Sequence, residues 1–203
     1  MQLLDALTPF VMPHVKNCPS QTALHHMREA LISFCTKTLV WRPVLADIPT
    51  VAGTDNYAMV FPANSSLVKL LRGWHNASPA DVVDQAKGMS SSSGLGKARI
   101  WTEDRKRVQL APAPSAAGVL RVMVALKPTR EATDIDDALF DDFAPVIADG
   151  ALASLLSMAD VSWANPAKSA FHQASFRSGC SKTASRAAKS FSSAKRSTKP
   201  FSH

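Results

Sequence analysis

Two stretches with a helical spacing of apolar residues flank a long section that lacks it, and this arrangement limits the folds open to the chain. The first stretch follows Ser20, a suitable helix N-cap, and predicts a helix over residues 20–39. The second has Thr133 and Asp136 in capping-box register and predicts a helix over residues 134–158, kinked or divided at Pro145. The two stripes are Leu24, Met27, Leu31, Phe34 and Thr38, and then Ile135, Leu139, Phe143, Val146, Ile147, Leu152, Leu155 and Leu156.

The section between residues 40 and 128 contains short segments rich in Val, Leu and aromatic residues, each bounded by Pro, Gly, Asn or Asp. Such segments are typical of strands. We expect a small antiparallel sheet with strands at residues 40–45, 57–61, 66–74, 107–111 and 118–126. Ser78-Pro79-Ala80-Asp81 combines a cap, a proline and an acid, which predicts a short helix over residues 78–87. Residues 88–96, with four consecutive serines, are expected to form a flexible loop.

The sequence therefore predicts an α+β protein, mainly a helical bundle interrupted by a small antiparallel β-insertion and followed by a long basic C-terminal tail or helix. The expected parts are the N-terminal bundle helices (1–39), the β-rich insertion (40–128), the C-terminal bundle helices (129–167) and the basic end (168–203). A short opening helix precedes Pro13, and Asn165-Pro166 starts the last helix. A length of 203 residues, 46% of them apolar, suits one domain plus an appendage. No membrane span or secretory signal is expected, and the three cysteines are expected to be reduced thiols.

The positive charge of the chain is concentrated at its C-terminal end. Residues 1–167 hold 15 Lys and Arg against 16 Asp and Glu, whereas residues 168–203 hold 8 Lys and Arg and no acid. Apolar side chains are sparse in this end, so we expect it to be mobile when free and to fold on binding a partner. A non-specific phosphate-binding arm explains the charge equally well, but it does not need the two phenylalanines. The candidate docking residues are Lys182, Arg186, Lys189, Phe191, Lys195, Arg196, Lys199 and Phe201.

The sequence contains no nucleophile–base pair, metal-ligand spacing or cofactor motif, so we expect neither an enzyme nor a cofactor or metal. Gly94-Leu95-Gly96-Lys97 lacks the other residues of a phosphate-binding loop. Cys35 lies on the apolar stripe and is expected to be a core thiol. An acidic cluster at the start of the second helix is expected to be a solvated face that the helix dipole favours, and a hydrolase built on it is a weaker alternative. The cluster consists of Asp134, Asp136, Asp137, Asp141 and Asp142.

Several short segments, in this order and spacing over most of residues 1–180, resemble the head-to-tail adaptor proteins of short-tailed bacteriophages, also known as tail tubular A-like proteins. The segments are Leu3-Leu4-Asp5 with Pro9, Cys18-Pro19, Ala30-Leu31-Ile32-Ser33-Phe34-Cys35, Leu39-Val40-Trp41-Arg42, Ala125-Leu126-Lys127-Pro128, residues 147–156, and Trp163-Ala164-Asn165-Pro166 with His172 and Phe176. The residues beyond Ser181 match no motif of the family.

The resemblance implies a structural protein of the virion, made in the cytoplasm of the host bacterium and located at the head-to-tail interface. Members of the adaptor family form a dodecameric ring beneath the portal protein, continue the DNA channel and carry tail nozzle or fibre proteins. The resemblance thus implies a homo-oligomer, with the basic end docking on the portal and duplex DNA passing without sequence-specific contact. Asp136, Asp137, Asp141 and Asp142 are candidates for the channel lining. The alternative is a nucleic-acid-binding protein that acts through its basic C-terminal tail.

Overall fold

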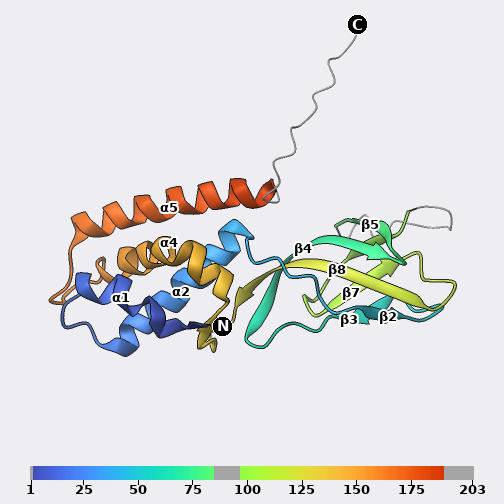
Figure 1. Cartoon of the computed structure of the whole chain (residues 1–203), viewed down its shortest axis with the longest axis horizontal. Helices are drawn as coiled ribbons and strands as arrows, with labels where there is room; N and C mark the ends of the chain where they lie inside the picture. Colours follow the sequence, from blue (N-terminus) through green and yellow to red (C-terminus); the bar gives the residue numbers. More distant parts are fainter. Residues whose placement is uncertain (1, 85–96, 190–203) are drawn as a thin grey trace, which may run out of the picture.

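The computed structural model describes residues 2–84 and 97–189, which form a helical lobe and a sheet lobe side by side (Figure 1). Both ends of the described chain build the helical lobe, and the section between them builds the sheet lobe. The helical lobe contains η1 (Leu4–Leu7), α1 (Thr8–Val11), η2 (Met12–His14), α2 (Ser20–Thr38), α4 (Asp137–Leu155) and α5 (Pro166–Ala188). The expected loop at residues 88–96 lies outside the described residues.

Helix α2 forms where its apolar stripe predicts it. Met27, Leu31 and Phe34 are fully buried, and the ring of Phe34 lies 5.2 Å from that of Phe143 in α4. The predicted capping role of Ser20 is wrong, because Ser20 is the first helical residue and Pro19 precedes it without a side-chain cap.

Helix α4 begins later than predicted and is not divided. Residues 134–135 form strand β9 (Asp134–Ile135), which pairs with β1 (Gln2–Leu3), so the helix starts only after Asp136. The carbonyl group of Asp136 accepts hydrogen bonds from the N–H groups of Leu139 and Phe140. Pro145 and the residue four positions before it are both exposed, so water can satisfy the carbonyl group that Pro145 leaves unbonded.

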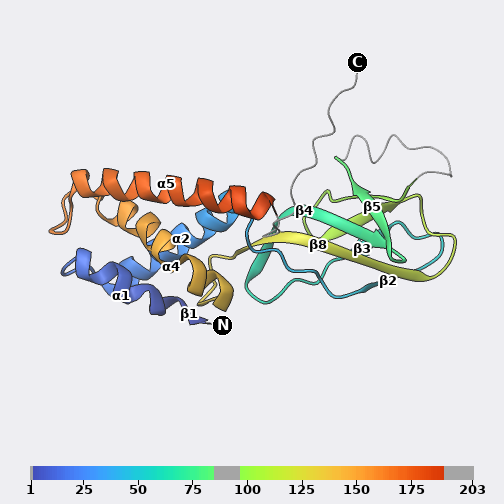
Figure 2. The same cartoon turned by 45° about the horizontal axis from the view of Figure 1, so that its top comes forward.

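Helix α5 runs along α4 and α2 on the outside of the lobe, as Figure 2 also shows. The prediction of its start is confirmed: the Asn165 side chain accepts a hydrogen bond of 3.0 Å from the N–H of Lys168. The helix buries one face, so the prediction that the basic end is mobile when free is wrong for residues 168–188. The buried residues are Ser169, Phe176, Cys180, Thr183 and Ala187.

In the described part of the chain, the sheet lobe is a seven-stranded mixed sheet in the order β2-β8-β4-β5-β6-β7-β3. Strands β5 and β6 are parallel, and all other neighbours are antiparallel. The sheet curls until its two edges approach: the Tyr57 hydroxyl on β3 donates to the carbonyl of Thr54 and accepts from the N–H of Val51, just after β2. The strands are β2 (Ile48–Thr50), β3 (Asn56–Ala58), β4 (Ser65–His75), β5 (Ser78–Val82), β6 (Arg99–Trp101), β7 (Arg107–Ala111) and β8 (Gly118–Pro128).

The predicted fold class, mainly a helical bundle with a small antiparallel β-insertion, is therefore wrong. The described residues between 40 and 128 form a nearly closed, barrel-like sheet with a core of its own, beside only four α-helices in residues 2–84 and 97–189. The core of this sheet includes Leu67, Ile100, Leu110, Leu120, Val122 and Leu126.

The strand predictions are confirmed for the segments around β3, β4, β7 and β8, but two other local predictions are wrong. Residues 40–45 form only an isolated bridge, between Val44 and Met123. The helix predicted at residues 78–87 is wrong over β5, because Asn76 and Ala77, at φ 49° and 65°, turn the chain so that Ser78 pairs with His75.

Two neighbouring residues connect the lobes. Trp41 packs against both hydrophobic cores. The Arg42 guanidinium donates to the carbonyl groups of Leu39, which ends α2, and of Ala187, in the last turn of α5. Within residues 2–84 and 97–189, none of the helices combines the length and the apolar character needed to cross a membrane.

Candidate interaction surfaces

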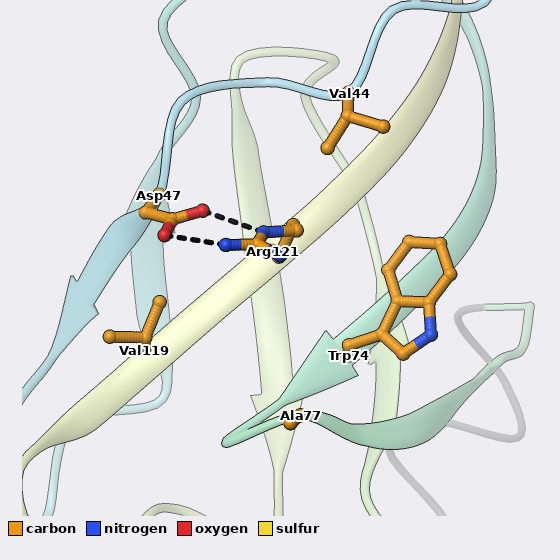
Figure 3. Close-up of a pocket in the computed structure, with 6 residues that line it drawn as sticks. All are labelled: Val44, Asp47, Trp74, Ala77, Val119 and Arg121. Atoms are coloured by element: carbon orange, nitrogen blue, oxygen red, sulfur yellow. Dashed lines mark hydrogen bonds and ion pairs between the residues drawn. The ribbon is translucent and has the colours of Figure 1, made fainter.

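A groove of about 480 Å³ crosses the outer face of the sheet lobe (Figure 3). Strands β4 and β8 place Trp74 directly opposite Arg121, and the segment before β2 brings in Asp47. Because these segments are far apart in the sequence, only the strand register assembles the site. The groove is lined by Val44, Asp47, Trp74, Ala77, Val119 and Arg121.

An ion pair fixes one side of the groove. The two carboxylate oxygens of Asp47 accept hydrogen bonds of 2.8 Å each from Nε and Nη2 of Arg121. Hydrogen bonding to Arg121 lowers the pKa of Asp47, and the same contact raises the pKa of Arg121. Both side chains stay about half exposed, at 50% and 55%, so they can still meet polar groups of a partner.

Apolar side chains flank this ion pair. Val44 and Val119 are 47% and 42% exposed, and Trp74 is half-buried. An apolar wall with a few fixed polar groups suits the binding of another molecule. The six lining residues include no Ser, Thr, Cys or His side chain, and the one carboxylate among them, that of Asp47, is held by Arg121.

The outward face of α5 is a second surface, on the other lobe. It lies opposite the buried face of the helix, and residues 161–189 contain no Asp or Glu. Among the described residues, no carboxylate forms an ion pair with Lys182, Arg186 or Lys189. Phe171 is 67% exposed near the other end of the helix. The exposed residues of α5 and the position after it include Lys168, Phe171, Arg177, Ser178, Ser181, Lys182, Ser185, Arg186 and Lys189.

The structure thus brings three of the predicted docking residues, Lys182, Arg186 and Lys189, to one end of α5. The others lie outside the described residues: Phe191, Lys195, Arg196, Lys199 and Phe201.

The predicted acidic cluster lies around the start of α4. Asp134 belongs to β9, Asp136 precedes the helix, and Asp137, Asp141 and Asp142 are exposed. Within residues 2–84 and 97–189, no group of three His, Cys, Asp or Glu side chains is arranged to hold a metal ion. The position of the exposed acids fits the expectation of a solvated face at a helix N-terminus.

The predicted core position of Cys35 is confirmed. Its side chain is fully buried, and burial raises the pKa of the thiol to about 12, with smaller contributions from Asp136 and Cys180. Cys18 and Cys180 are also buried and free.

One polar pair, His172 and Asp149, was not predicted from the sequence. Nδ1 of His172 on α5 lies 2.8 Å from a carboxylate oxygen of Asp149 on α4, and the His172 ring meets the His14 ring edge-on. In the described part of the chain, no Ser, Thr or Cys side chain hydrogen-bonds the His172 ring. The pair joins α4 and α5.

No known family model matches the chain, and no curated protein matches it.

Proposed function

We propose that the chain is a connector of a short-tailed bacteriophage virion, an adaptor ring that joins the portal to the tail and continues the DNA channel. The observation that carries the proposal is that the groove lies on the sheet lobe, whereas α5, which leads into the C-terminal end of the chain, belongs to the helical lobe. A protein with two chemically distinct surfaces at separate places can hold two partners at once. The resemblance of the sequence to head-to-tail adaptors supports the same assignment.

In this proposal the C-terminal end, with Phe191 and Phe201, docks on the portal, because aromatic side chains are common anchors of protein interfaces. The groove of the sheet lobe binds a tail nozzle or fibre protein through Val44, Val119 and Trp74. Twelve copies form the ring, which is the stoichiometry that the resemblance implies. Each protomer in such a ring contacts its neighbours through two different surfaces.

Native mass spectrometry of the full chain, alone and mixed with the purified portal oligomer of the same phage, tests the proposal. We expect a complex that carries a ring of copies on the portal. Deleting residues 190–203 should abolish this complex. This deletion leaves α5 whole, whereas a cut at residue 181 would also remove the buried side chains of Thr183 and Ala187.

Absence of any complex between the full chain and the portal contradicts the connector. If the deletion instead removes a salt-sensitive affinity for DNA, the alternative of a nucleic-acid-binding protein replaces it. Val119→Asp in the groove is the matched control, because it should impair binding of the tail protein and leave portal binding unchanged.

A further inference from the structure

Three cations at the C-terminal end of α5 point to the same side of the helix. Lys182, Arg186 and Lys189 are spaced at i, i+4 and i+7, and all three are exposed. None of them is paired with a carboxylate of the described residues, and α5 itself carries none. Positive charge that the chain does not neutralise is available to an anionic partner.

The side chains between these cations are small and polar. Ser178, Ser181 and Ser185 are exposed on the same side, and Ser181 and Ser185 line a shallow hollow together with Lys182 and Arg186. Lysine and serine are depleted in protein–protein interfaces. Lysine, arginine and serine are, in contrast, common contacts to nucleic-acid phosphates. The residue types of this half of α5 therefore favour a phosphate polymer over a protein.

The positive surface continues past the helix end. Arg42 holds the last turn of α5 through the carbonyl of Ala187, and the exposed Arg72 on β4 lies near Arg42. The pKa of Arg42 is lowered by burial and, to a smaller extent, by the charge of Arg72. The junction of the lobes thus adds positive charge beside the end of α5.

We infer that the α5 basic face, defined as Ser178, Ser181, Lys182, Ser185, Arg186 and Lys189, binds the phosphate backbone of double-stranded DNA without reading its sequence. This inference rests on the proposed function, since it names the surface of the connector that meets the passing duplex. From Lys182 to Lys189 the helix rises about 10 Å, which is about three base-pair steps of 3.4 Å. Contacts to phosphates alone allow a protein to slide along DNA.

This assignment separates two sets of the predicted docking residues. Lys182, Arg186 and Lys189 contact DNA, and the residues after position 189 remain the candidates for the portal. It also moves the DNA-facing surface from the acids at the start of α4 to α5, because exposed carboxylates repel phosphates.

Binding of the full chain to a labelled 30-base-pair duplex, measured by fluorescence anisotropy at several salt concentrations, tests the inference. The wild-type affinity should fall steeply with salt. The triple variant Lys182→Ala, Arg186→Ala, Lys189→Ala should bind about tenfold or more weakly at low salt. Its slope of log K against log salt should be flatter by about 2–3, since each phosphate contact contributes about 0.9.

The matched control removes the same number of charges from the connection between β6 and β7 and the first residue of β7, in the sheet lobe. Arg105, Lys106 and Arg107 are exposed, and their replacement by alanine should leave the salt slope unchanged. The conservative variant Lys182→Arg, Lys189→Arg should bind DNA as the wild type does. Circular dichroism shows whether each variant keeps its helices.

Equal losses in the α5 variant and in the control overturn the inference, because net charge alone would then explain the binding. A wild-type chain with no salt-dependent affinity for DNA also overturns it. A third contrary result is an α5 variant that loses the portal complex and keeps its affinity for DNA. In that case the α5 basic face binds a protein, and the connector stands without this inference. The proposed connector function is tested separately, by native mass spectrometry. It is contradicted if the wild-type chain forms no complex with the portal.

Discussion

Replacing Gly179 by alanine tests how tightly α5 is held against α4. A Cβ atom at this position would lie 2.6 Å from Cγ1 and 3.0 Å from Cγ2 of Val146. Carbon atoms in contact are ordinarily about 3.5–4.0 Å apart. Valine in a helix has one strongly preferred rotamer, so its methyl groups cannot turn away freely. Either α5 has to move or Val146 has to leave its preferred rotamer.

Two opposing terms set the size of the effect. Overpacking of this kind costs about 1–3 kcal/mol. Alanine is more favourable than glycine in a helix interior by about 1 kcal/mol. We expect Gly179→Ala to lower the free energy of unfolding by about 1 kcal/mol and the melting temperature by about 2–4 °C. Urea unfolding followed by circular dichroism measures the first quantity, and a thermal scan measures the second.

A double-mutant cycle isolates the contact. In a Val146→Ala background the methyl groups are gone, so Gly179→Ala should stabilise the chain by about 1 kcal/mol through helix propensity alone. The coupling energy between the two sites is then about 2 kcal/mol. Ser178→Ala, one residue away on the exposed side, is the control and should change stability by less than about 0.5 kcal/mol. The close approach of α4 and α5 is refuted if Gly179→Ala stabilises the wild type as much as it stabilises the Val146→Ala variant.

Arg42→Ala should lower the free energy of unfolding by about 1–2 kcal/mol, as urea unfolding can show, because the guanidinium bonds carbonyl groups at the ends of both α2 and α5. Cys35 should resist iodoacetamide in the native chain at about pH 8, because burial raises its thiol pKa to about 12; rapid labelling seen by mass spectrometry would contradict this. The folded pKa of Asp47 is depressed below its ordinary value of 3.8, so the stability from its pair with Arg121 is fully present above that value. This contribution should disappear as the pH falls through the folded pKa of Asp47. The free energies of unfolding of the wild type and of Arg121→Gln, plotted against pH, should therefore converge at that pH.

The helices α2 and α5 follow from local signals in the sequence. An apolar stripe predicts the first, and the Asn165-Pro166 pair predicts the start of the second, because caps and periodicity depend only on near neighbours. Strand β5 shows the limit of such signals. Ser78-Pro79 reads as a helix start, but the positive φ angles of Asn76 and Ala77 send the chain back along β4. Local sequence does not reveal a pairing that a turn imposes.

Packing distances account for the other differences. The basic end looks too poor in apolar residues to fold, yet residues up to 188 are helical because Gly150 and Gly179 let α5 approach α4 closely. The amino-acid composition gives the number of apolar residues, but it does not show how closely two helices can pack. The groove escapes sequence analysis for a similar reason. Trp74 and Arg121 become neighbours only through the register of β4 and β8, 47 residues apart in the numbering.

Helix dipoles favour some of the charges of the helical lobe, such as Asp137 in the first turn of α4 and Arg186 in the last turn of α5. Acids around the first turn of α4 and bases around the last turn of α5 are each favoured by about 0.3–1 kcal/mol. The dipole does not explain why α5 lacks carboxylates altogether, since an acid in its own first turn would also be favoured. A surface that meets phosphate has a reason to exclude them.

That exclusion gives a direct prediction at the centre of the α5 basic face. Ser181→Glu adds one carboxylate at an exposed helical position, where glutamate is a good helix former, so the fold should be kept. The affinity for duplex DNA at low salt should fall about two- to fivefold, which corresponds to about 0.5–1 kcal/mol for one exposed charge interaction. Ser115→Glu, at an exposed position in the sheet lobe, adds the same charge and should leave the affinity unchanged. Equal affinities of the Ser181→Glu variant and the wild type would mean that phosphates do not approach this face, and the lack of acids on α5 would then need another cause.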